Sequence, residues 1–170
     1  PFTLVAPVDR SVSNVQGALN SVVAGGGGDN PEAMVEALYQ VVTGEGYLPW
    51  IPARSPCAGP GRTGYACFRR EAQPIVVLIA DAPSHNGPTA GPRDTAYNDV
   101  TFLRPPGCPA SLPACAAARG PHTYAETRAA LVRANARVIG ISSGSAGLSG
   151  AGDLLAIARD TATVTAAGAP

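Results

Sequence analysis

One short apolar run constrains the fold more than any other stretch of the chain. Residues 75–80 read IVVLIA, four of the six are Ile or Val, and the run lies between Pro74 and Pro83. The prolines leave too few residues for a buried helix, so the run predicts a strand. Because it is apolar on both faces, we expect a central strand of a parallel sheet, buried on both sides.

Asp81 follows this strand directly. In open α/β sheets, functional residues gather at the carboxyl ends of strands. Burying an unpaired carboxylate is costly, so a cation or strong hydrogen-bond donors are expected near Asp81.

Periodic segments alternate along the rest of the chain. Asp9 or Ser11 suits the cap of a first helix, Asn30 caps the next, and Thr123 with Glu126 forms a capping-box pattern. The alternation predicts an α/β fold with a parallel sheet. The expected elements are an edge strand (1–8), helices (12–22 and 31–43), the central strand (75–80), a helix (124–132), a second buried strand (138–141) and a short helix (153–159).

Length and charge narrow the function classes. A chain of 170 residues is enough for one domain with a sizeable core. Its net charge is zero, which predicts no nucleic-acid partner, and its twelve cations are all arginine, which excludes lysine chemistry. No apolar run approaches the ~20 residues of a membrane span, so none is expected.

The four cysteines form two local pairs in Pro- and Gly-rich stretches, Cys57 with Cys67 and Cys108 with Cys115. Neither spacing resembles the close C-x-x-C pairs of zinc sites. We expect two disulfide-stapled loops, Cys57–Cys67 and Cys108–Cys115, with free thiols or another pairing as the alternatives. Disulfides predict an oxidising compartment, outside the cell or in the periplasm.

Two motifs are typical of enzymes or nucleotide-binding proteins, but the residues that should accompany each motif are not in the expected places. Residues 140–144 match G-x-S-x-G around Ser142, yet both histidines, His85 and His122, lie upstream of it. The glycines at 25–28 follow a predicted helix and are not followed by G-K-[ST], which speaks against nucleotide binding. We therefore expect no enzymatic activity. A metal-dependent hydrolase is the alternative, with His85 as its candidate acid or base.

Three carboxylates form the candidate site. Asp29 and Glu32 lie at a predicted helix start, and Asp81 ends the central strand. If the helix packs beside the strand, the three converge, and a hard divalent cation would offset their repulsion. The alternative is that Asp29, Asn30 and Glu32 only cap the helix.

The same residues carry a resemblance to a known family. The glycine run with Asp29-Asn30-Pro31-Glu32, the helix with residues 36–40, and residues 77–85 together resemble the von Willebrand factor A domain. Within that family they are most similar to the I-like branch of integrin β subunits and its bacterial relatives. The resemblance covers most of residues 1–164, as a partial domain, and leaves 165–170 as an irregular tail. It implies a Rossmann-like, three-layer parallel sheet with flanking helices.

The resemblance also implies a function. In this family a metal-ion-dependent adhesion site offers its cation to an acidic group of a protein ligand, outside the cell or at its surface. Glu32 and Asp81 would belong to that site with Mg²⁺ or Mn²⁺, and Asp29 would serve an adjacent cation such as Ca²⁺. The alternative is a structural module with an incomplete, silent metal site. Further metal or ligand contacts are expected from Asn30, Pro31 and His85.

The family's first motif, D-x-S-x-S, needs separate treatment. Asp9-x-Ser11-x-Ser13 matches it literally, but only one predicted helix separates it from the glycine run. In the family, further strands intervene, so we expect a chance match. The chain would then lack the domain's first two strands, one helix and first motif, and would stop before its last strand.

Overall fold

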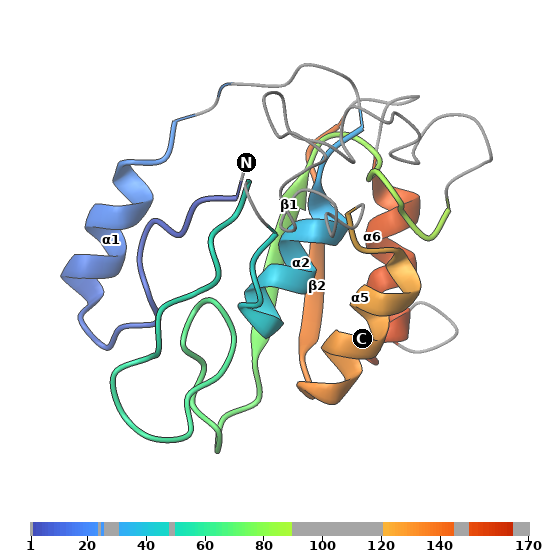
Figure 1. The fold of residues 1–170 in the computed structure, drawn as a ribbon. Coiled ribbons are helices and arrows are strands. Elements are labelled where there is room, and N and C mark those ends of the chain that lie inside the picture. The colour runs from blue at the N-terminus through green and yellow to red at the C-terminus, as the bar shows by residue number, and fades with distance from the viewer. Residues whose placement is uncertain are drawn as a thin grey trace, which may run out of the picture.

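The computed structural model describes residues 2–23, 25, 31–47, 50–89, 121–144 and 150–164. Within them the chain forms four helices and a two-stranded parallel sheet, which confirms the α/β class (Figure 1). The elements are α1 Val12–Asn20, α2 Met34–Thr43, β1 Ile75–Ala80, α5 Tyr124–Arg133, β2 Arg137–Ser142 and α6 Ala151–Asp160. Residues 2–8, expected as an edge strand, form none; Pro7 has no N–H to donate to a ladder.

The apolar run forms β1 with the predicted bounds. It pairs with β2 along its whole length, from Ile75 opposite Arg137 to Ala80 opposite Ser142. The strands are far apart in sequence, and the intervening chain supplies the crossover that a parallel pair needs. Asp81 therefore lies at the carboxyl end of β1, as the sequence predicts.

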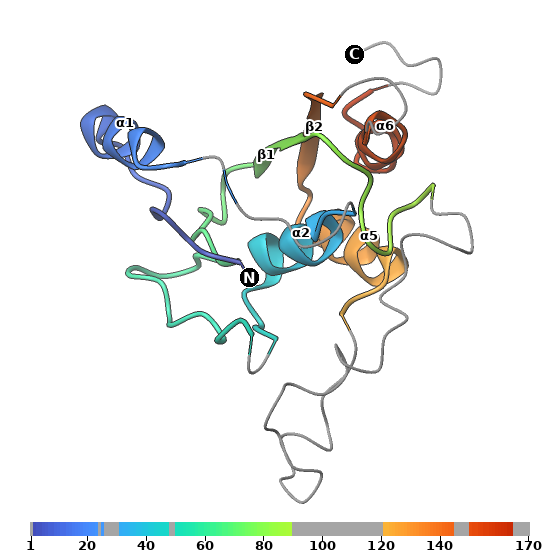
Figure 2. The same cartoon turned by 90° about the horizontal axis from the view of Figure 1, so that it is seen from above.

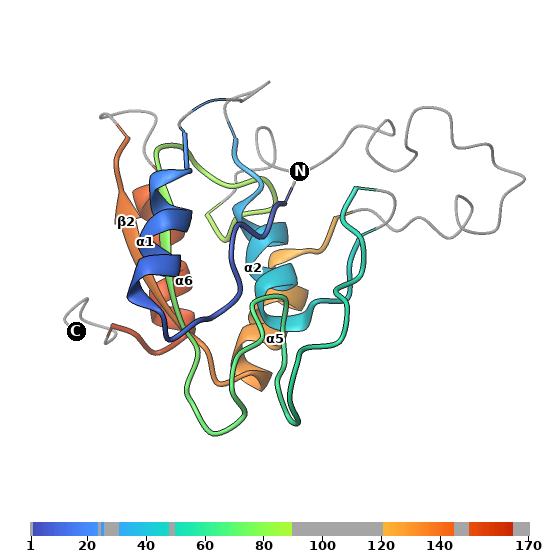
Figure 3. The ribbon, with the colours of Figure 1, turned by 90° about the vertical axis from the view of Figure 1, so that its left-hand side faces the viewer.

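Three helices pack against one face of the sheet. Figures 2 and 3 show α2 and α5 together on the same side of the strands. On α6, Leu154 lies so close to Gly140 of β2 that a Cβ there would meet Leu154 Cβ at 2.7 Å. The main core cluster consists of Leu38, Tyr39, Val42, Ala130, Leu131, Ala136, Val138 and Ile157.

The opposite face of the sheet is open. Val77 is 55% exposed and Ile79 is 65% exposed, and β2 exposes Ile139 and Ile141 beside them. The prediction that the run is buried on both faces is therefore wrong for the part of the chain that the structure describes, because the helices packed on the sheet share one face. These residues form two layers, a sheet and its helices.

Helix α2 begins later than predicted. The sequence places its start at Pro31, whereas the helix begins at Met34 after Ala33, whose side chain makes no cap hydrogen bond. Glu32 instead forms an isolated parallel β-bridge with Ser84, and this pairing keeps the backbone of Glu32 extended. The predicted end is confirmed, since Gly44 closes the helix at φ 71°, a conformation that favours glycine.

The other caps follow the sequence. Thr123 and Glu126 form the predicted capping box of α5, with both reciprocal hydrogen bonds present. Ser11 caps α1 by accepting the N–H of Asn14. Helix α1 stands apart from the other helices in Figures 1 and 2 and has no buried residue, so its apolar stripe does not join the core.

The long segment between α2 and β1 contains the predicted Cys57–Cys67 disulfide, which the structure confirms. Cys108 and Cys115 lie outside the described residues, so their pairing stays a prediction. None of the described helices has the length and apolar character needed to cross a membrane.

Candidate functional site

Two backbone hydrogen bonds bring Glu32 to the end of β1. The N–H of Glu32 donates to the Pro83 carbonyl at 2.8 Å, and the N–H of His85 donates to the Glu32 carbonyl at 2.8 Å. The segment before α2 thus runs parallel to the segment that follows Asp81. This pairing, rather than helix packing alone, positions the two predicted carboxylates.

Buried polar groups fix the loop that follows Asp81. The Ser84 side chain is fully buried, and its Oγ accepts the N–H of Val35 at 3.1 Å. The Ser84 N–H in turn donates to Oδ2 of Asp153, on α6, at 2.7 Å. The loop is therefore tied to both α2 and α6, and its path is set by side chains outside the loop.

Asp153 is the centre of this arrangement, although no motif in the sequence points to it. It is only 1% exposed. Besides Ser84, its carboxylate accepts the N–H of Thr89 at 3.0 Å and the Thr89 hydroxyl. Gly87 lies against this carboxylate so closely that a Cβ would overlap it. The three donors offset the cost of burying the charge, which makes Asp153 a structural residue.

Glu32 and Asp81 line one hollow at the carboxyl end of β1, called here the strand-end hollow. Its volume is about 500 Å³. Asp81 is exposed and Glu32 is half-buried, so both residues keep surface that solvent can reach. The remaining lining residues are Gly25, Ala33, Met34, Ala37, Leu78, Ile79 and Ala80. The structure therefore brings together two of the three predicted metal ligands.

The other predicted contacts have different outcomes. Asp29 and Asn30 lie outside the described residues, and their roles stay predictions. Pro31 is half-buried beside Glu32. His85 is buried and does not line the strand-end hollow. Within the described ranges, no group of three or more His, Cys, Asp or Glu residues is placed to hold a metal ion.

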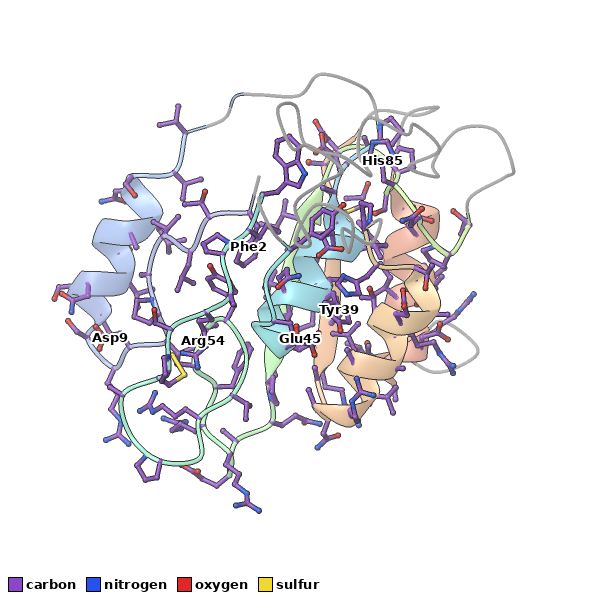
Figure 4. All side chains as sticks on the ribbon, viewed as in Figure 1. Phe2, Asp9, Tyr39, Glu45, Arg54 and His85 are labelled. Atoms are coloured by element: carbon purple, nitrogen blue, oxygen red, sulfur yellow. A yellow bond between two sulfur atoms is a disulfide. The ribbon has the colours of Figure 1, made fainter. Side chains whose placement is uncertain are left out.

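Asp9-x-Ser11-x-Ser13 caps a helix at the other end of the molecule. Figure 4 shows Asp9 at the end opposite His85, which follows β1. The Asp9 carboxylate accepts the Asn14 side-chain amide at 2.7 Å and the Ser11 N–H at 3.0 Å. These two hydrogen bonds, the Asn14 one first, lower the pKa of Asp9. The local geometry is that of a helix cap, away from the strand-end hollow.

The G-x-S-x-G match does not form a nucleophile elbow. Ser142 is the last residue of β2, Ser143 and Gly144 are not helical, and the next described helix begins at Ala151. An elbow places its serine on a sharp turn directly into a helix.

A buried carboxylate–histidine pair was not predicted. Glu36 lies on the buried face of α2. Its Oε2 accepts the backbone N–H of His122 at 2.7 Å and also lies 2.9 Å from the ring nitrogen Nδ1 of His122. Gln40 donates to Oε1 of the same carboxylate at 2.7 Å. The Tyr39 ring stacks on the imidazole with centroids 3.4 Å apart. The pair fastens the start of α5 to α2.

Comparisons of the chain with models of protein families, with curated proteins and with solved structures find no match.

Proposed function

We propose that this chain is a metal-dependent binding module in which Glu32 and Asp81 share a divalent cation. One observation carries the proposal: Glu32 and Asp81 both line the strand-end hollow, on two segments joined by backbone hydrogen bonds. Oxygen donors of this kind suit Mg²⁺ or Mn²⁺, and Asp29 is proposed as a further ligand or as the ligand of an adjacent Ca²⁺.

The cation would act by recruiting an acidic group. Two protein carboxylates leave coordination positions open, and a carboxylate of a protein ligand could take one of them. Glu32 and Asp81 are the ionisable side chains among the described lining residues, so the hollow offers no acid–base partner beside them. We therefore propose binding without catalysis. The resemblance to metal-ion-dependent adhesion sites supports the same function.

The finer fold is part of this proposal. A von Willebrand factor A-like domain has a third layer of helices on the second face of its sheet. The exposed Ile and Val side chains of β1 and β2 are the residue types that such a layer would cover. A location outside the cell or in the periplasm is proposed on the Cys57–Cys67 disulfide.

Thermal unfolding tests the site. A cation that binds the folded state stabilises it by about 2.7 kcal/mol at a hundredfold excess over its Kd, or roughly 5 to 10 °C for a chain of this size. We expect Mg²⁺ or Mn²⁺ to raise the melting temperature of the chain and Asp81→Asn to remove that rise. Glu71→Gln is the matched control, because Glu71 is an exposed carboxylate that precedes the amino end of β1, does not line the hollow and lies 3.9 Å from Arg69.

An equal metal response in wild type and Asp81→Asn would refute the assignment. So would the absence of any response in the wild type. Loss of the response in Glu71→Gln as well would indicate diffuse charge screening instead of a site.

A further inference from the structure

A second hollow lies between the N-terminal segment and the disulfide-stapled loop. It measures about 590 Å³, and its lining includes Leu4 and Val8 from one side and Arg54, Arg62 and Tyr65 from the other. We call it the arginine hollow. Figure 4 shows Arg54 beside the sulfur–sulfur bond of the loop.

The walls of the arginine hollow are fixed to the core. Tyr65 donates its N–H to the Val41 carbonyl of α2 at 2.9 Å and its hydroxyl to the Pro52 carbonyl at 3.1 Å. Val8 donates its N–H to the Ala66 carbonyl at 3.1 Å, and the Phe2 ring packs edge-on against Tyr65. The hollow is therefore built by specific contacts on both sides.

Two guanidinium groups converge on one residue of this hollow. Nη1 of Arg54 lies 3.0 Å from Sγ of Cys67, and Nη1 of Arg62 donates to the Cys67 carbonyl at 3.2 Å. A guanidinium has five N–H donors, so these contacts within the described residues leave further donors of each group for a ligand. Both side chains are half-buried, and no carboxylate of the described residues lies within 4.0 Å of either.

Charge and apolar surface define the ligand. Residues 2–23 and 50–73 contain five arginines and two carboxylates, although the whole chain has no net charge. Leu4 and Val8 are exposed at the rim. Planar guanidinium groups bind carboxylates bidentately, and the rim offers apolar contact beside them.

We propose that the arginine hollow binds a peptide segment of a protein partner that carries Glu or Asp next to an apolar residue. The binding needs no cation, because the charge that meets the carboxylate comes from Arg54 and Arg62. It is separate from the proposed function, and chelation of divalent ions distinguishes the two.

The test uses a blocked hexapeptide of alternating Glu and Leu, measured by fluorescence polarisation with EDTA present. We expect it to bind, and the Gln–Leu peptide of the same length to bind at least about tenfold more weakly, as expected for the loss of charged hydrogen bonds. Arg62→Gln should weaken the Glu–Leu peptide by a similar factor. Arg69→Gln is the matched control and should change affinity less than about twofold, because Arg69 pairs with Glu71 and does not line the hollow.

A second variant protects the test against loss of folding. Val8→Asp puts a carboxylate on the exposed rim without touching Arg62, and it should also weaken the Glu–Leu peptide. Unchanged binding in both Arg62→Gln and Val8→Asp would overturn the proposal, as would equal binding of the two peptides. Tighter binding of inorganic phosphate than of the Glu–Leu peptide would also overturn it, in favour of a phosphate site.

Discussion

Single buried polar residues decide how the loops meet the helices in this protein. Asp153 fixes the loop after β1, and Glu36 fastens the start of α5 to α2. Neither could be selected from the sequence, because a carboxylate in a helix looks the same whether its donors are solvent or a distant loop. Glu32 and Asp81 could be selected, because each follows a local signal, a helix start or a strand end.

The ionisation of Tyr39 makes the folding stability depend on pH. Burial, and then its hydrogen bond to Glu45, raises the pKa of Tyr39 to about 12. Because this pKa lies above the unfolded value of about 10, the contribution to stability is complete below pH 10 and is lost as the pH rises towards 12. Burial also raises the pKa of Tyr124, so the wild-type slope has more than one source.

Comparison with Tyr39→Phe isolates the contribution of Tyr39. Urea unfolding at several pH values between 9 and 12 should show that wild-type stability falls more steeply above pH 10 than that of Tyr39→Phe. Parallel curves for the two proteins would show that Tyr39 ionises as easily folded as unfolded.

The positions of most helices and strands could be predicted from local sequence signals. Capping residues and prolines placed α5 and β1 well, since both signals act on the nearest backbone. The start of α2 was misplaced because Glu32 pairs with Ser84, a contact between distant segments. The two-sided burial of β1 was wrong for a related reason: an apolar run shows that both faces are apolar, but not what packs on each.

The two faces of the sheet should respond differently to the same substitution. Val138 is fully buried against the helices, whereas Val77 is 55% exposed on the open face. Val138→Ala should cost about 2 kcal/mol of unfolding free energy and Val77→Ala less than about 1 kcal/mol, because only the first leaves a cavity. Chemical denaturation of both variants checks this. Equal losses would show that the open face is covered in solution.

At the scale of the whole molecule, the two hollows lie in different environments. The strand-end hollow carries two carboxylates, and the arginine hollow carries two guanidinium groups. The first was predicted from the sequence as a place, the end of β1, but not as a shape. The arginine hollow was not predicted from the sequence. Its walls come from residues 2–8 and 52–67, and the backbone hydrogen bond that joins them leaves no pattern in the sequence.

Paramagnetic broadening by Mn²⁺ would detect the cation that we propose at Glu32 and Asp81. In a two-dimensional NMR spectrum of the amide groups, substoichiometric Mn²⁺ should broaden the signals of Glu32, Ala33 and Asp81 first. The signals of residues 11–14, in the helix cap at the other end of the molecule, should stay sharp. Broadening centred on residues 9–14, or spread evenly over the exposed carboxylates, would show that no cation is held specifically by Glu32 and Asp81.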